Sequence, residues 1–256
     1  MFPLRDSPRP ERSAVVTWLL VLANVAVFAY LALALPDAAA QQEFAERFGL
    51  VPARVRLAFG HPRLFLDAPW PAVRDSVLPF LTAMFLHGGV LHLFGNVWFL
   101  HVFGDNVEGR LGARRFLVFY LVCGVVASAL HIVSIPPTGV AQDWRGAFVV
   151  GRNVALDVPM VGASGAIAGV LGAYVVMFPR SRVLTFLPPI FLVELPAFLF
   201  LGVWFALQFF AARSMSFTGS IGVGVAYWAH VGGFVAGVVL GLLAPRSRRN
   251  DGGGRR

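Results

Sequence analysis

The sequence predicts an all-α membrane protein built as a six-transmembrane-helix bundle, and two observations support this fold class. The 256 residues are 57% apolar and only 13% charged, whereas an ordinary soluble domain is about 25% charged. The apolar residues also gather into long runs such as 14–35 and 93–103, and a run of about 20 residues crosses roughly 30 Å of hydrocarbon. Composition and patterning therefore agree on a membrane protein.

Six spans are expected along the chain. They cover about 14–35, 79–103, 114–135, 159–178, 195–212 and 221–244. The first run is preceded by arginines, as a secretory signal would be, but it has 22 residues and a signal's apolar core has about 7 to 15; a retained span is favoured. Before the fifth span, Pro188 and Pro189 interrupt the apolar pattern, so we expect 183–194 to be an apolar loop.

The positive charges predict the orientation. All 21 basic residues are Arg, and with six spans the arginines of the N-terminus, of 104–115, of 180–182 and of the C-terminal tail fall on one face, which should be cytoplasmic. We therefore expect a cytoplasmic segment 1–13, one membrane domain 14–244, and a disordered cytoplasmic tail 245–256. The net charge of +8 is explained by these topology signals, so the lipid bilayer rather than nucleic acid is the expected partner. The expected location is a bacterial inner (plasma) membrane.

The outer connection, 36–78, is not a plain linker. Phe44, Phe48, Leu50 and Val51 alternate with polar residues in a helical rhythm, which is typical of an interfacial amphipathic helix. A loop packed on the outer helix ends fits the same pattern. The single cysteine, Cys123, excludes an internal disulfide and a Cys-based metal site, and no cofactor or metal is expected.

Polar side chains inside the spans are expensive and mark candidate functional positions. Ser164 lies 16 residues before Arg180, and His230 lies 16 residues before Arg246, which places both about 24 Å from the inner boundary at 1.5 Å per residue. The same count brackets this level with two side chains of the second span, His92 and Asn96. Three helices thus bring polar groups to one plane near the outer surface.

Glycines indicate which of these helices touch. Gly165 and Gly169 form one stripe beside Ser164, and a second stripe one turn below His230 consists of Gly233, Gly237 and Gly241. Small residues at this spacing let membrane helices approach closely, so the serine and the histidine could reach hydrogen-bond distance. Taken singly, each residue has a simpler explanation. Such a serine is usually bonded back to its own helix, such a histidine is a packed or interfacial residue, as we expect for His101 and His131, and such an asparagine ties two helices.

These residues resemble the rhomboid family of intramembrane serine proteases. The resemblance is carried by 162–165 (Gly-Ala-Ser-Gly), by the histidines and asparagine of the second span, and by 229–237 with its histidine and glycines, and it extends to 48–52, 104–108 and 159–161. It implies a six-helix bundle with a Ser-His dyad that opens to water from the outer face. By position, Ser164 would be the nucleophile, His230 the general base and acid, and His92 with Asn96 the oxyanion hole. His87 matches a position at the cavity mouth.

The chain departs from the family pattern at two places. The family's Trp-Arg pair is missing before His87, where the chain reads Val77-Leu78-Pro79, so the anchoring of the outer loop is open. Ala168 stands where some relatives have a tyrosine that packs on the histidine, so support for His230 must come from elsewhere. No carboxylate lies in the fourth or sixth span, and Asp157 is expected to be a loop residue.

The expected function is that of a serine endopeptidase that cleaves transmembrane substrates, single-span ones by resemblance, near the outer membrane face. The chief alternative is a catalytically silent rhomboid-like protein that binds client membrane helices without cutting them. A transporter is disfavoured because broken or charged helices at mid-membrane are missing, and a zinc protease because no His-Glu-x-x-His occurs. The sequence leaves natural substrates, pathway, oligomeric state and substrate entry open.

Overall fold

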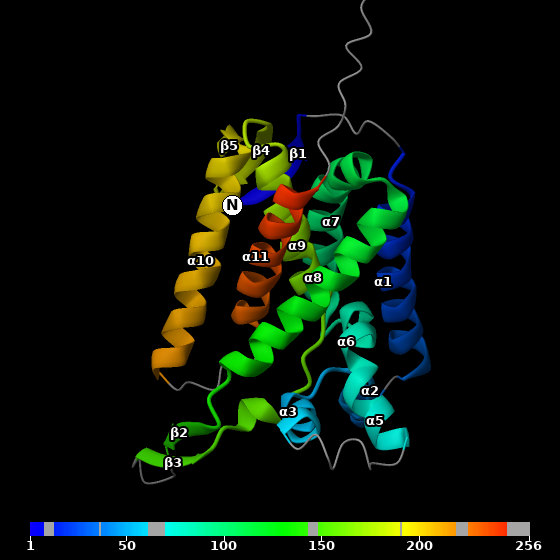
Figure 1. The fold of residues 1–256 in the computed structure, drawn as a ribbon, viewed down its shortest axis with the longest axis vertical. Coiled ribbons are helices and arrows are strands. Elements are labelled where there is room, and N and C mark those ends of the chain that lie inside the picture. The colour runs from blue at the N-terminus through cyan, green and yellow to red at the C-terminus, as the bar shows by residue number, and fades with distance from the viewer. Residues whose placement is uncertain are drawn as a thin grey trace, which may run out of the picture.

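A computed structural model describes residues 1–7, 13–35, 37–60, 70–142, 148–189, 191–218 and 225–244. Within these ranges the chain is mostly helical, and the long helices stand side by side as a bundle (Figure 1). The all-α membrane class is therefore confirmed. The tail expected at 245–256 and the start of the sixth expected span, 221–224, lie outside the described residues.

Six long or apolar helices make up the bundle. They are α1 (Val15–Ala34), α7 (Val90–Leu111), α8 (Ala113–Ser134), α9 (Ser164–Met177), α10 (Ala197–Thr218) and α11 (Tyr227–Leu243). Among the described residues, α1, α8 and the 197–214 part of α10 are each long and apolar enough to cross a membrane alone, and α7 qualifies together with the bent helical segment before it. Helices α9 and α11 are apolar but shorter, with 14 and 17 residues. The number of six spans thus remains a prediction.

The second expected span, 79–103, is not one helix. The short helices α6 (Pro79–Thr82) and η1 (Ala83–Phe85) come first, and α7 begins only at Val90, at 78° to the preceding segment Trp70–Phe85. Helix α7 also runs eight residues past the predicted end. Both sides of the bend are apolar, so the average composition of 79–103 does not reveal the break, although Gly88 and Gly89 stand at it.

Helix α9 stands in the centre of the bundle (Figure 1) and is almost wholly buried. It begins at Ser164 rather than at 159, because residues 158–163 approach it as a non-helical segment. Irregular backbone at membrane depth is tolerated where it lines a cavity, and this segment does so. Helix α9 is therefore shorter than the predicted span 159–178, because 159–163 belong to this non-helical segment.

The glycine stripes pack as predicted. A Cβ atom at Gly237 would lie 1.9 Å from the carbonyl oxygen of Gly169, and one at Gly172 would lie 2.1 Å from the carbonyl oxygen of Phe234. On its other side α9 meets α8, where a Cβ atom at Gly169 would lie 2.4 Å from that of Cys123. Since no side chain fits at these points, α9 is held between α8 and α11 at nearly backbone-to-backbone distance. Cys123 is a buried free cysteine at this contact.

The C-terminal half of α7 is tied to the N-terminal part of the chain. Its Glu108 carboxylate accepts hydrogen bonds from the backbone nitrogens of Val16 and Thr17, at 2.9 and 2.7 Å, and from the Thr17 hydroxyl. A carboxylate at the start of a helix satisfies free N–H groups and complements the dipole. Glu108 thereby caps α1, whose own N-cap residue, Ala14, has no side-chain oxygen to do so.

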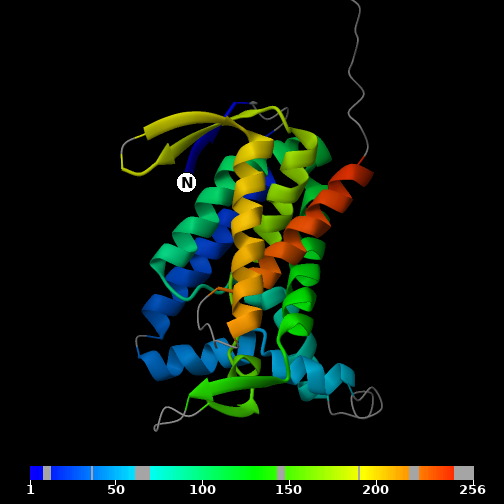
Figure 2. The ribbon, with the colours of Figure 1, turned by 90° about the vertical axis from the view of Figure 1, so that its left-hand side faces the viewer.

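The segment 183–194, expected as a loop, forms a β-hairpin instead. Strands β4 (Arg182–Leu187) and β5 (Phe191–Pro196) pair antiparallel, and β1 (Phe2–Asp6) adds to β4 to give the order β1-β4-β5. The sheet projects sideways from the bundle (Figure 2). The Asp6 carboxylate accepts hydrogen bonds from the Tyr174 hydroxyl, at 2.5 Å, and from the Asn106 amide, at 2.8 Å. Residues 2–6 of the expected cytoplasmic segment 1–13 thus form a strand.

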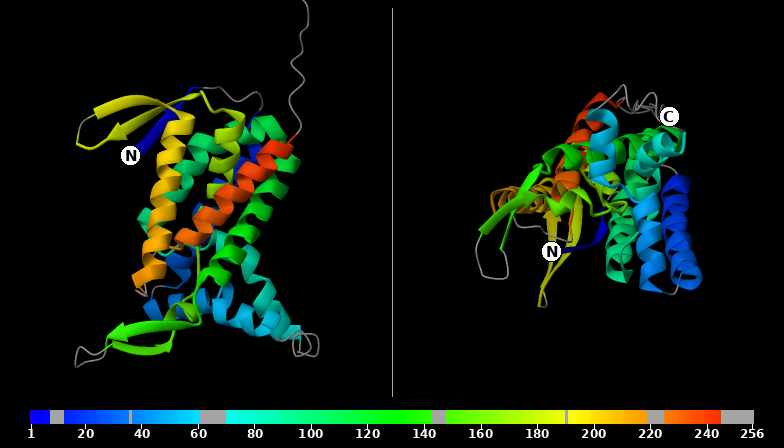
Figure 3. Two further views of the ribbon diagram at one scale, coloured as in Figure 1. Left: turned by 60° about the vertical axis from the view of Figure 1, so that its left-hand side comes forward. Right: turned by 90° about the horizontal axis from the view of Figure 1, so that it is seen from below.

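The remaining short elements gather at the opposite end of the bundle (Figures 1 and 3). They are α2 (Ala38–Phe48), α3 (Pro52–Gly60), α5 (Trp70–Val77), the strands β2 (Thr138–Gln142) and β3 (Phe148–Arg152), and η2 (Val154–Leu156). The first chain element and the end of α11 lie at the other end, with the α7–α8 turn. The side of the membrane that each end faces stays a prediction.

The outer segment is anchored without the Trp-Arg pair. Leu50, fully buried, exchanges two backbone hydrogen bonds with Met160, at 3.0 and 2.8 Å, and the Thr82 hydroxyl donates to the carbonyl of Phe48 at 2.6 Å. The Arg56 side chain donates to the backbone carbonyl of Ile132, at the end of α8. The outer segment is thereby tied to the strand that leads into α9, to the bend before α7 and to α8.

Candidate active site

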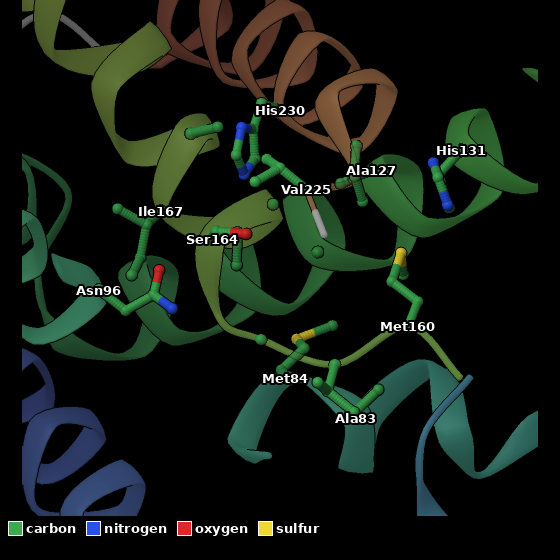
Figure 4. A pocket seen from close by; sticks show the side chains of 18 of the residues that line it. Ala83, Met84, Asn96, Ala127, His131, Met160, Ser164, Ile167, Val225 and His230 are labelled. Carbon is green, nitrogen blue, oxygen red and sulfur yellow. The ribbon is translucent and has the colours of Figure 1, made fainter. Parts of the chain in front are cut away.

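A cavity of about 690 Å³ opens beside the N-terminal end of α9. Its walls come from the bend before α7 and from α7, α8, α9, α10 and α11, together with the segment that precedes α9. Figure 4 looks into this cavity and shows Ser164 between Asn96 and His230, while His131 lies on α8 beyond Met160 and Ala127. Four of the five predicted site residues line it: Ser164, His230, His92 and Asn96.

Ser164 is the first residue of α9. The chain reaches it through Gly162, whose φ of +125° is a conformation that side-chain-bearing residues rarely adopt. The first backbone N–H groups of a helix have no partner within it and lie at the positive end of the dipole. The serine hydroxyl is therefore presented to the cavity beside backbone donors suited to a developing negative charge.

The turn at Gly162 places the segment that leads into Ser164 against His92 and Asn96. A Cβ atom at Gly162 would stand 2.8 Å from the His92 ring, at Cε1 and Nε2, and 3.8 Å from the Asn96 amide nitrogen. Both side chains are on α7, one turn apart, and therefore project from one face of the helix. The glycine is required here by its backbone angle and by the space that the histidine ring occupies.

Both α7 side chains offer hydrogen-bond donors to the cavity. The Asn96 amide nitrogen is buried and has no hydrogen-bond partner in the structure, which is an expensive condition for a neutral donor. The Gly88 backbone N–H donates to His92 Nδ1 at 3.4 Å. An imidazole nitrogen that accepts leaves the other to carry the proton in the neutral ring, so His92 Nε2 is a donor. Asn96 thus brings an unused donor to the cavity that Ser164 lines, and His92 brings a second side-chain N–H.

His230 stands in the first turn of α11, beside Ala229, which contacts α9 near Gly165. Its ring lies above Ser164 in Figure 4, with one nitrogen directed toward the serine. The packing of α11 against α9 sets this position, because the backbones touch one turn below, where Gly233 meets Gly165. The glycine stripes therefore fix the distance between the two helices at the level of the two side chains.

Two residues of α10 that the sequence analysis missed contact His230. The Gln208 side-chain oxygen lies 2.8 Å from His230 Nδ1, and the Trp204 ring is tilted over the histidine ring at 5.9 Å between centroids. These contacts replace the packing that Ala168 cannot supply. The signal was present in the sequence, since Gln208 is the one amide side chain in the expected span 195–212, and an amide in a span is expensive.

His87 is placed differently from the other predicted residues. It is buried and lines a second cavity, of about 360 Å³, between α1, α2 and the start of α7. This cavity shares Gly88 and Val161 with the larger one, and the rings of His87 and His92 meet edge to face at 5.2 Å. His87 therefore adjoins the site rather than lining it.

Two further histidines differ in their positions. His131, expected to be a packing residue, lines the large cavity from α8, and its Nδ1 is buried without a partner. His101 packs against Trp18 and Trp98, as expected. Among the described residues no three His, Cys, Asp or Glu side chains gather at a spacing that could hold a metal ion. The independence from metals and cofactors remains a prediction.

Residues 74–247 match the Rhomboid domain, a range that contains every side chain of the site. The chain belongs to the rhomboid family. The resemblance noted in the motifs is thereby confirmed, and this rhomboid matches the domain across all helices from α7 to α11.

Individual relatives of this rhomboid are about 30% identical. Rhomboid protein 1, mitochondrial, of Saccharomyces cerevisiae is 29% identical over 186 residues, 70% of this chain and 47% of the relative. Rhomboid protease GluP of Bacillus subtilis is 32% identical over 164 residues, 63% and 26% respectively. The human presenilin-associated rhomboid-like protein, mitochondrial, is 29% identical over 121 residues, 47% and 28%. The matches span half or less of each relative's length.

Proposed function

We propose that this rhomboid is an intramembrane serine endopeptidase that cleaves membrane-protein substrates near the outer face of the bilayer. The observation that carries the proposal is the convergence, on one cavity, of a serine at a helix start, a histidine above it and an amide donor without a partner. The printed name of the Bacillus relative, a rhomboid protease, supports the same activity. The alternative of silent client binding does not explain why an unpaired donor is kept beside a serine.

The proposed reaction is acyl transfer through Ser164. His230 takes the proton of the serine hydroxyl as the oxygen attacks the scissile carbonyl carbon, and then donates that proton to the amine that leaves. A water molecule next attacks the acyl-enzyme, His230 accepts its proton, and Ser164 recovers it as the acid product departs. The negative charge on the carbonyl oxygen would be met by Asn96, by His92 Nε2 and by the Ser164 backbone N–H.

A cavity of this kind addresses the two difficulties of hydrolysis inside a bilayer. Water must reach the bond, and the cavity lies at the end of α9 that faces the outer elements α2, α3 and α5. The substrate helix must release its backbone hydrogen bonds, which hydrocarbon makes expensive. We therefore propose substrates with a single span that contains Gly, Pro or other small residues near its outer end.

Topology and location are part of the same proposal. Six spans with segment 1–13 and tail 245–256 in the cytoplasm would place the site toward the outer surface, and a bacterial plasma membrane is the expected location. The relatives named above include mitochondrial and bacterial proteins and do not decide between the two membranes. Reporter fusions at the C-terminus, in cells of the source organism, test the orientation.

Cleavage by purified protein tests the proposal. The protein is incubated in detergent with a single-span substrate and compared with Ser164→Ala, with His230→Ala and with Ser134→Ala, a serine outside the cavity. The proposal expects product from the wild type and from Ser134→Ala only. If Ser164→Ala forms as much product as the wild type, Ser164 is not the nucleophile. A substrate that co-purifies but stays whole with every variant would favour the client-binding alternative.

A further inference from the structure

The hydrogen bond between α10 and α11 carries an inference about how the histidine is held. Gln208 Oε1 lies 2.8 Å from His230 Nδ1, in a span whose other side chains are apolar or aromatic from Leu201 to Phe210. We propose that Gln208 is a positioning residue that fixes the tautomer of His230. The inference rests on the proposed role of His230 as the base. It names the residue that supports His230 in a site without a carboxylate.

The chemistry of the two atoms decides the direction of the hydrogen bond. With the amide oxygen of Gln208 facing Nδ1, the hydrogen bond forms in the tautomer in which His230 Nδ1 carries the proton and donates it. The neutral ring then has its lone pair on Nε2, the nitrogen farther from the backbone. Figure 4 shows the ring with one nitrogen directed toward Ser164, and with Nδ1 engaged by Gln208 that nitrogen is Nε2. A base needs this tautomer to accept the serine proton.

The same arrangement is achieved in soluble serine proteases by a buried aspartate that accepts from the histidine Nδ1–H. A carboxylate in a membrane span would be far more expensive than an amide. Gln208 accepts the same hydrogen bond without a charge, although it stabilises a protonated histidine less. The side chain therefore suits a site surrounded by hydrocarbon.

The neighbouring contacts make the position specific. Trp204, one turn earlier on α10, is tilted over the His230 ring at 5.9 Å, and Phe205 stacks on Phe234 of α11 at 4.5 Å. These aromatic contacts fix how α10 lies against α11, and Gln208 then supplies the polar contact. By contrast, Leu207, adjacent in sequence, has 59% of its surface exposed on the outside of the bundle and offers a matched control.

The first test reads the tautomer without using activity. Nitrogen NMR of protein labelled with ¹⁵N-histidine distinguishes Nδ1–H from Nε2–H rings, and His230→Ala identifies the relevant signals. We expect the Nδ1–H form in the wild type and in Leu207→Ala. Gln208→Leu should shift His230 toward the Nε2–H form. A wild-type spectrum with Nε2–H, or no change in Gln208→Leu, would overturn the proposal.

The second test reads turnover. Gln208→Leu should lower kcat by about 10- to 100-fold, less than the roughly 10⁴-fold loss when a triad aspartate is replaced, while KM stays within about twofold because the substrate is not touched. Gln208→Glu keeps the acceptor and should restore the Nδ1–H tautomer. If Gln208→Leu does not fold, Gln208→Met replaces it. If the wild type shows the expected tautomer but no cleavage, the proposed protease activity is contradicted and the hydrogen bond is not. A normal kcat in Gln208→Leu would overturn the positioning role of Gln208.

Discussion

Gly233 of α11 lies so close to Gly165 of α9 that a Cβ atom on Gly233 would stand 1.9 Å from the Gly165 carbonyl oxygen. Gly165 directly follows Ser164, and Gly233 is three residues beyond His230. The contact therefore sets the distance between α9 and α11 at the level of Ser164 and His230. A change here moves the histidine relative to the serine without altering either side chain.

Substitution of Gly233 by Ala should separate α9 from α11. The added methyl group normally stabilises a helix by about 0.5–1 kcal/mol, but forcing atoms into a filled contact costs about 1–3 kcal/mol or more, so the clash wins. We expect a lower midpoint of thermal unfolding in detergent and cleavage reduced at least 10-fold. The matched control is Gly202→Ala on α10, where a Cβ atom meets nothing within 4 Å; equal behaviour of the two variants would refute this account of the helix contact.

Substitution of Asn96 by Ala should separate catalysis from stability. Loss of one oxyanion donor typically lowers kcat by about 10²- to 10³-fold. The amide nitrogen of Asn96 has no partner in the resting protein, so its removal relieves a buried unpaired group, and the unfolding midpoint should stay equal or rise. Kinetics and thermal unfolding on the same preparation check both parts. An unchanged kcat, or a drop in stability large enough to explain the loss, would contradict the assignment.

Asp6 should make the docking of β1 depend on pH. Burial raises the pKa of Asp6 to about 6. The hydrogen bonds from Tyr174 and Asn106 lower this pKa but do not offset the effect of burial. When β1 is docked, Asp6 binds its proton more tightly than in a released segment, where an aspartate has a pKa of about 3.9. Docking of β1 is therefore strongest below about pH 4 and weakens as the pH rises to about 6. Above that range both forms are ionised and the loss is constant.

The variant Asp6→Asn removes this titration and keeps the shape of the side chain. The stability of Asp6→Asn relative to wild type should grow between pH 4 and 6 and level off above pH 7, as read from thermal unfolding across a pH series. If the stability difference between Asp6→Asn and wild type stays flat or shrinks as pH rises, the pKa of Asp6 is not raised in its contact with Tyr174 and Asn106.

The features that the sequence predicted well are those encoded by local spacing. Glycines one turn apart, as at Gly233 and Gly237, must share a helix face, so their contact with a neighbouring helix could be expected from the spacing alone. The gathering of Ser164, His92 and Asn96 followed from counting residues to the inner arginines, because the rise per helical residue is constant. His230 was reached by the same count.

The features that the sequence did not reveal depend on contacts between distant segments. The bend before α7 lies at 86–89, where Gly88 and Gly89 follow His87, and an average hydropathy over the whole of 79–103 does not register so short an interruption. The pairing of β1 with β4 joins residues more than 170 positions apart, and the Leu50–Met160 bridge joins the outer segment to the approach to α9. Gln208 was not predicted as a site residue, because the count to the arginines compared only α7, α9 and α11, and α10 runs in the opposite direction.

The most direct measurement of the central claim is the site of covalent capture by a fluorophosphonate. The Ser164 oxygen would attack phosphorus and displace fluoride while His230 takes the hydroxyl proton, and mass spectrometry of the digested protein locates the adduct. The account predicts an adduct on Ser164 in the wild type and its loss in His230→Ala. Absence of any adduct on Ser164, or equal modification of Ser164 in His230→Ala, would contradict it.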